Sequence, residues 1–130
     1  MTPELRERLL SEARNVLKQA YSPYSKFKVG AAVLTANGGI YTGVNVENAS
    51  YGLTNCAERT AIFSAITAEG PSMRVVAVAV WSDPECACAP CGACRQVIHE
   101  FGRDAAVLFP GENGVREMRA CELLPAGFSL

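Results

Sequence analysis

The sequence has 130 residues, of which 49% are hydrophobic and 19% are charged, so it is long enough to bury a core without disulfides. The 12 Lys and Arg residues nearly balance the 13 Asp and Glu residues, which argues against a basic surface that binds nucleic acid. The sequence has no apolar run long enough to span a membrane, and its N-terminus lacks the apolar core of a signal peptide. We therefore expect a single cytoplasmic domain, residues 1–130, with neither a membrane nor a nucleic-acid partner.

The first third of the sequence predicts a helix followed by a hairpin of two strands. Thr2 is a suitable N-cap, Pro3 suits the first helical position, and the turn-prone segment YSPYS ends the helix. The residues at helical spacing that form its apolar stripe are Leu5, Leu9, Ala13, Val16, Leu17 and Ala20. Residues 27–35 and 40–46 are predicted strands, and the intervening Asn37-Gly38-Gly39 favours a hairpin turn.

Helices and strands alternate in the rest of the sequence. A second helix is expected to begin near Cys56, and a third to begin with Pro90 at its first position and to continue through CGACRQVIHEF. Residues 75–81 and 105–109 are short apolar runs typical of central strands. The buried side of the second helix is predicted to consist of Ile62, Phe63, Ala65 and Ile66. This order predicts an α/β fold, a three-layer α/β/α sandwich with a mixed central sheet.

Six cysteines are present, and four of them lie within nine residues, which is too crowded for a disulfide framework and favours a metal site. A helix that begins at Pro90 places Cys91 and Cys94 on one face of its first turn, where both thiolates reach one ion. Free N–H groups at helix starts lower thiol pKa values, and Cys56 offers a third thiolate in the same setting. Three ligands with an open fourth position are typical of catalytic zinc.

Two charged residues follow Cys56 closely. Glu58 lies two residues after it, close enough to move protons at the metal without acting as a ligand. Arg59 lies three residues after it, on the same side of the helix, where its guanidinium could hydrogen-bond to the zinc thiolates.

Cysteine spacing alone leaves one alternative open, a non-enzymatic zinc module. In that alternative, Cys56 is an ordinary buried thiol and four other cysteines close a structural four-thiolate site. Those four are Cys86, Cys88, Cys91 and Cys94.

The strings CAERTA and PCGACRQ, with FKVGAA, GVNVENASYG and LLPAGF around them, resemble the zinc-dependent cytidine deaminase family in its three-cysteine form. The resemblance implies that Cys56, Cys91 and Cys94 hold Zn²⁺ and that Glu58 is the catalytic proton shuttle. It also implies hydrolytic deamination of cytidine and 2′-deoxycytidine to uridine and 2′-deoxyuridine, with release of ammonia, in pyrimidine salvage. A related deaminase of a nucleoside antibiotic, of the blasticidin S type, stays open as an alternative.

The same resemblance implies how the nucleoside is held. Asn45 and Glu47, two residues apart at the end of a strand, are expected to face the same way and bind the ribose. The resemblance further implies a homotetramer with shared active sites, in which aromatic residues from neighbouring subunits cover the pyrimidine. The full set of expected substrate contacts is Phe27, Asn45, Glu47, Ala49, Tyr51, Ala57 and Phe128. No cofactor besides zinc is expected, and we assign no role to His99, Gln96 or Cys121.

Overall fold

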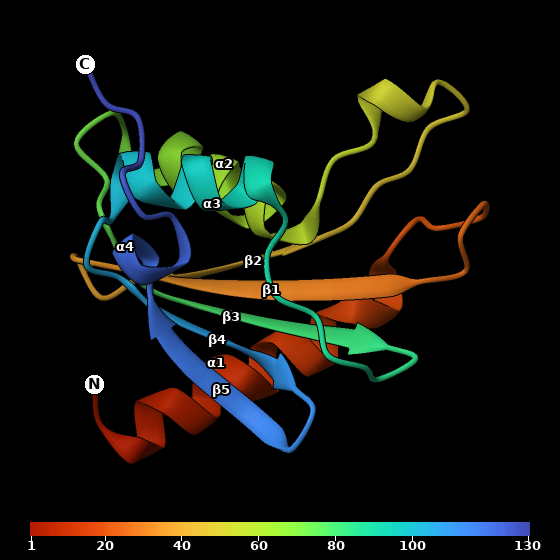
Figure 1. The fold of residues 1–130 in the computed structure, drawn as a ribbon, viewed down its shortest axis with the longest axis horizontal. Coiled ribbons are helices and arrows are strands. Elements are labelled where there is room, and N and C mark those ends of the chain that lie inside the picture. Colours follow the sequence, from red (N-terminus) through yellow and green to blue (C-terminus); the bar gives the residue numbers. More distant parts are fainter.

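The computed structural model describes residues 1–130 and contains a five-stranded sheet in the order β2-β1-β3-β4-β5, with helices on both faces (Figure 1). The strands are β1 (Lys28–Thr35), β2 (Ile40–Val44), β3 (Val75–Asp83), β4 (Ala106–Gly111) and β5 (Gly114–Arg119). Neighbouring strands are antiparallel except for β3 and β4, which are parallel. The predicted mixed sheet and three-layer α/β/α fold are therefore confirmed.

The helices divide between the two faces of the sheet. Helix α1 (Pro3–Val16) lies on one face, and α2 (Ala57–Glu69) and α3 (Gly92–Phe101) lie together on the other (Figure 1). Three short helices complete the chain, η1 (Leu17–Gln19), η2 (Tyr51–Leu53) and α4 (Ala120–Leu123). None of these helices combines the length and the apolar character needed to cross a membrane.

The sheet separates two hydrophobic cores. Along β1, Val29, Ala31 and Val33 belong to the core beneath α2 and α3, whereas Ala32 and Leu34 belong to the core beneath α1. This alternation follows from the period of two in a strand, and it explains why both faces of β1 are apolar. The central strands thus hold the two helix layers in place.

The structure contains two elements beyond the predicted order, β5 and α4. Strand β5 is an edge strand whose residues are mostly exposed, and its sequence GVREMR contains only scattered apolar residues. An edge strand buries little apolar surface, so its sequence lacks the apolar run that marks a central strand.

Two local predictions are wrong. Helix α3 begins at Gly92, with Cys91 as its N-cap, and Pro90 is a buried residue before the helix instead of its first residue. Phe63 was expected in the core but is 46% exposed on α2, whereas Ala61, Ile62 and Ala65 are fully buried. Helical spacing allowed several apolar stripes on α2, and only packing against the sheet selects one of them.

Candidate metal and catalytic site

Two helix starts bring three cysteines together. Cys56 is the N-cap of α2, Cys91 is the N-cap of α3, and Cys94 lies in the first turn of α3. An N-cap side chain usually accepts a hydrogen bond from the helix backbone. Neither Cys56 nor Cys91 does so, and their thiols are therefore not used as helix caps. The Sγ atoms of this cysteine cluster lie within 4.8 Å of one another.

The spacing of the cysteine cluster suits zinc. Two thiolates at about 2.3 Å from one ion, related by a tetrahedral angle, lie about 3.8 Å apart. The Sγ atoms of Cys56 and Cys91 are 3.7 Å apart. Cys91 is exposed and Cys94 is buried, so the cluster is open to solvent on one side. A three-thiolate set of this kind fits a zinc ion that keeps one position for a reactant.

Arg59 lies against the cysteine cluster. Its Nη2 donates a hydrogen bond to Cys56 Sγ at 3.3 Å. Hydrogen bonds from Cys94, Arg59 and Cys91, with that from Cys94 the strongest, lower the pKa of Cys56 to about 5. The thiolate is the form of cysteine that binds metal, so Cys56 is prepared for ligation near neutral pH. The pKa of Arg59 is raised in turn by its hydrogen bond to Cys56.

Glu58 is a buried acid beside the same cluster. Its side chain is only 4% exposed, and desolvation raises its pKa to about 7. At neutral pH the carboxyl group therefore exists in both protonation states, which suits a group that must accept a proton and then release it.

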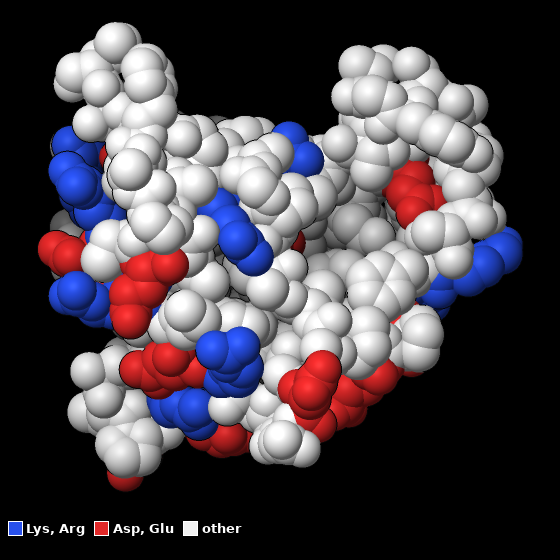
Figure 2. Space-filling model, viewed as in Figure 1, with Lys and Arg blue, Asp and Glu red and all other residues white.

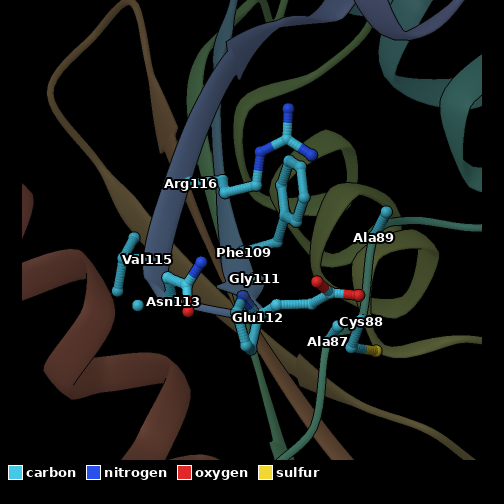
Figure 3. Close-up of a pocket in the computed structure, with 11 residues that line it drawn as sticks. Ala87, Cys88, Ala89, Phe109, Gly111, Glu112, Asn113, Val115 and Arg116 are labelled. Atoms are coloured by element: carbon cyan, nitrogen blue, oxygen red, sulfur yellow. The ribbon is translucent and has the colours of Figure 1, made fainter.

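Cys86 and Cys88 lie outside the cysteine cluster, in the loop between β3 and α3. Figure 3 shows Cys88 at the wall of a different cavity of about 500 Å³, formed between this loop and the β4–β5 hairpin. Burial raises the pKa of Cys88 to about 11, which keeps its thiol protonated. The structure thus favours the three-cysteine set over the four-cysteine module.

Asn45 braces the start of β1 in this structure. Its Oδ1 accepts from the Val29 N–H at 2.9 Å, and its Nδ2 donates to the Phe27 carbonyl at 2.7 Å. Phe27 is half-buried and packs against the core beneath α2 and α3. The polar atoms of Asn45 are thus engaged by backbone, and the residue positions Phe27.

Glu47 faces a cavity of about 410 Å³ lined by Tyr24, Ser25, Glu47, Tyr51 and Thr54. Its carboxylate accepts hydrogen bonds from the N–H groups of Tyr24 and Ser25 and from the Ser25 hydroxyl. The hydroxyl contact is the main reason that the pKa of Glu47 is lowered, so the group is ionised. Tyr24 and Ser25 lie in the turn-prone segment YSPYS, whose Ser and Pro residues predict a turn but give no sign of a contact with Glu47.

A short backbone pairing connects the Glu47 cavity to the cysteine cluster. Val46 and Asn55 exchange two hydrogen bonds, of 2.9 and 3.0 Å, immediately before Cys56. The segment between them contains η2 and stands out from the body of the molecule, with a hollow beside it (Figures 1 and 2). Tyr51 on this segment is 76% exposed, and Ala49 is exposed as well.

The C-terminal tail runs along α3. Gln96 Nε2 donates to the Phe128 carbonyl at 3.0 Å, which gives Gln96 a role in holding the tail. The Phe128 side chain is 68% exposed. His99, for which the sequence suggested no role, is buried beneath the tail, and neither of its ring nitrogens has a hydrogen-bond partner.

The fold and the cysteine cluster together define a zinc-binding α/β protein with a buried acid beside the ligand set, and comparisons with known proteins agree. The family described as the cytidine and deoxycytidylate deaminase zinc-binding region matches residues 3–109. A cytidine deaminase of Sporosarcina psychrophila is 47% identical over 125 residues, which cover 95% of this chain and 90% of that protein. The crystal structure of a cytidine deaminase from Burkholderia pseudomallei matches with a TM-score of 0.86 and 46% identity, over 98% of this chain and 100% of that one. The chain belongs to the cytidine and deoxycytidylate deaminase family.

The cysteine assignment predicts which substitutions remove the metal. Replacing Cys86 and Cys88 together by Ser should leave about one zinc per chain, because neither thiol reaches the cysteine cluster. Cys56→Ser should abolish zinc binding, since it removes one of three ligands. Metal analysis of the purified variants measures both results, and the reverse pattern would support the four-cysteine module.

The burial of Glu58 predicts a pH-dependent cost in the metal-free protein. The unfolded chain releases the Glu58 proton near pH 4.5, whereas burial raises the folded pKa to about 7, so stability should fall as pH rises between these values. Glu58→Gln removes this cost, which corresponds to about 3 kcal/mol at pH 8. Urea unfolding with chelator and reductant measures the free energy of unfolding at pH 4 and pH 8. The difference in this free energy between Glu58→Gln and the unsubstituted protein should shift in favour of the variant at pH 8. The same difference between the two proteins at pH 4 and at pH 8 would contradict the raised pKa of Glu58.

Proposed function

We propose that this protein hydrolyses cytidine and 2′-deoxycytidine to uridine and 2′-deoxyuridine, with release of ammonia, as part of pyrimidine salvage in the cytoplasm. The observation that carries the proposal is the buried Glu58 beside three thiols at zinc spacing. The similarity to proteins named cytidine deaminase supports the substrate. All six cysteines are free, as suits a reducing compartment.

The reaction needs a nucleophile and two proton deliveries at the cytosine ring. Cys56, Cys91 and Cys94 would hold Zn²⁺, which would supply the Lewis-acid chemistry that lowers the pKa of the water molecule attacking C4. Glu58 accepts a proton from this water and transfers it to ring N3. It then takes the proton of the new C4 hydroxyl and delivers it to the amine, so that the C4–N bond breaks as the C4 carbonyl forms. One water is consumed and one ammonia is released. Because Glu58 is almost fully buried, bulk water does not compete for these protons.

Arg59 adjusts the charge of the site. Three thiolates around Zn²⁺ give a net charge near −1, which opposes the acidification of water. The hydrogen bond from Arg59 Nη2 to Cys56 Sγ withdraws electron density from that sulfur. We therefore assign Arg59 the role of restoring the Lewis acidity of the metal.

The ribose is assigned to the Glu47 side of the site. Glu47 is ionised and faces its own cavity, so it can accept hydrogen bonds from sugar hydroxyls. Asn45 contributes by holding Phe27 in place, and because a carbonyl oxygen has two lone pairs, its Oδ1 can accept a sugar hydroxyl in addition to the Val29 N–H. The N–H of Ala57 is the first of α2 and has no intrahelical acceptor, so it is available to the base.

The remaining cover of the pyrimidine is assigned to neighbouring subunits of a homotetramer. Tyr51, Ala49 and Phe128 are exposed in the isolated chain, on the projecting segment and on the tail. Large exposed aromatic side chains are typical of interfaces. We propose that they complete the active sites of adjacent copies.

The proposed chemistry is tested with Glu58→Gln. This variant should keep about one zinc per chain while its turnover of cytidine falls by at least ~10²–10⁴-fold, the usual contribution of a general acid–base. Exposed Glu100 on α3 provides the control, and Glu100→Gln should deaminate cytidine at the normal rate. Absence of uridine and ammonia with the zinc-loaded parent would refute the function, and turnover of blasticidin S alone would identify the antibiotic deaminase.

The shared site is tested by complementation. Glu58→Ala and Phe128→Ala should each be nearly inactive, because one lacks the proton shuttle and the other lacks the cover of the base. When both are co-expressed, some sites of the mixed oligomers combine an intact Glu58 from one chain with an intact Phe128 from another. The activity should therefore exceed that of either variant expressed alone. Mixed oligomers without recovered activity would place Phe128 within its own subunit.

A further inference from the structure

Helix α2 rests directly on the backbone of β2 at one residue, Gly43. A Cβ added to Gly43 would meet three backbone atoms at less than 3.0 Å, with Ala61 N the nearest and the Ala57 carbonyl oxygen at 2.7 Å. These neighbours are backbone atoms, so no change of side-chain rotamer could make room. Only glycine allows α2 to lie this close to the sheet.

The contact lies at the functional end of α2. Ala57, whose carbonyl rests against Gly43, stands between the zinc ligand Cys56 and the proton shuttle Glu58 in the sequence. Any side chain at position 43 would therefore push on the turn that carries both residues.

The opposite end of α2 is tied to the β1–β2 hairpin. Glu69, the last residue of α2, accepts hydrogen bonds from Thr35 Oγ1 at 2.7 Å, Tyr41 Oη at 3.0 Å and Asn37 Nδ2 at 3.2 Å. With this end anchored, a side chain at position 43 would tilt the first turn of α2 away from the sheet.

We propose that Gly43 is a positioning residue for the metal site, which sets the height of Cys56 and Glu58 above the sheet so that they meet the thiols of α3. The inference rests on the zinc site of the proposed function. Relieving the contact with the Ala57 oxygen to an ordinary 3.4 Å requires a movement of about 0.7 Å. Metal–ligand distances tolerate only about 0.2 Å. The required movement of the helix backbone is larger than the range of metal–ligand distances. The zinc site therefore depends on the absence of a side chain at Gly43.

Gly30 on β1 supplies a matched control. It lies next to β2 in the sheet, paired with Val44, and a Cβ there would meet the Ala13 carbonyl oxygen and Leu17 at less than 3.0 Å. The steric conflict is as severe as at Gly43, but it falls on the α1 side of the sheet. None of the assigned ligand, catalytic or substrate residues lies on α1 or η1.

The experiment compares Gly43→Ala with Gly30→Ala. Both should lower the free energy of unfolding of the metal-free protein, measured with urea. Only Gly43→Ala should weaken zinc affinity, by about 10–100-fold in competition with a chromogenic chelator. It should also shift the thiolate-to-metal absorption bands of the Co²⁺-substituted protein. Its kcat for cytidine at saturating zinc should fall by about 100-fold, as for a misplaced catalytic group, while Gly30→Ala stays close to the parent.

Equal losses of zinc affinity in the two variants would overturn the proposal, as would normal zinc affinity and an unchanged Co²⁺ spectrum in folded Gly43→Ala. Failure of Gly43→Ala to fold, alone or together with Gly30→Ala, would assign the residue to global packing and also overturn it. If the parent binds zinc but does not deaminate cytidine, the proposed function fails while the metal measurements still decide the role of Gly43.

Discussion

Helices α2 and α3 begin side by side on one face of the sheet, and each has a cysteine at its N-cap. Thiolates repel one another, so three of them can share a small volume only where positive charge balances them. The two helix N-termini and Arg59 supply part of that charge, and Zn²⁺ would supply the rest when bound. The positions of Cys94, Glu58 and Arg59, in the first turns of these two helices, follow from this convergence of two helix ends.

Close packing between α2 and the sheet makes this convergence possible. Gly43 on β2, with Ala57 and Ala61 on α2, leaves little side chain between helix and strand. Small residues let backbones approach closely, and close approach reduces the freedom of α2 to rotate or slide. The same packing buries Glu58, which raises its pKa towards the pH at which a proton shuttle works best.

The two halves of the site differ in exposure. The half to which we assign the chemistry lies at two helix starts and includes the buried Glu58, whereas the half assigned to the nucleoside includes Tyr51 and Phe128, which are largely exposed on a loop and on the tail. Rigid elements hold catalytic groups precisely, and loops allow a substrate to enter and leave. This division supports the proposal that neighbouring copies close the pocket.

The sequence by itself determined the features that are local in the chain. Apolar runs at strand and helix spacing predicted the α/β sandwich, and cysteines at two helix starts with an acid two residues after Cys56 predicted a metal site, because spacing along a helix or strand dictates which side chains share a face. Cysteine spacing alone left the four-cysteine module open, and the resemblance to the deaminase family implied the three-cysteine set and the role of Glu58. Only the tertiary structure decided the rest. It showed that Phe63 faces outwards, that β5 forms an edge, that Asn45 braces β1, and that Ser25 and Tyr24 hold Glu47. It also revealed the contact at Gly43. Each of these features depends on which segments, distant in the sequence, come into contact. A hydrophobic pattern cannot show that glycine is required at position 43, because the requirement comes from the backbone of α2 that packs against it.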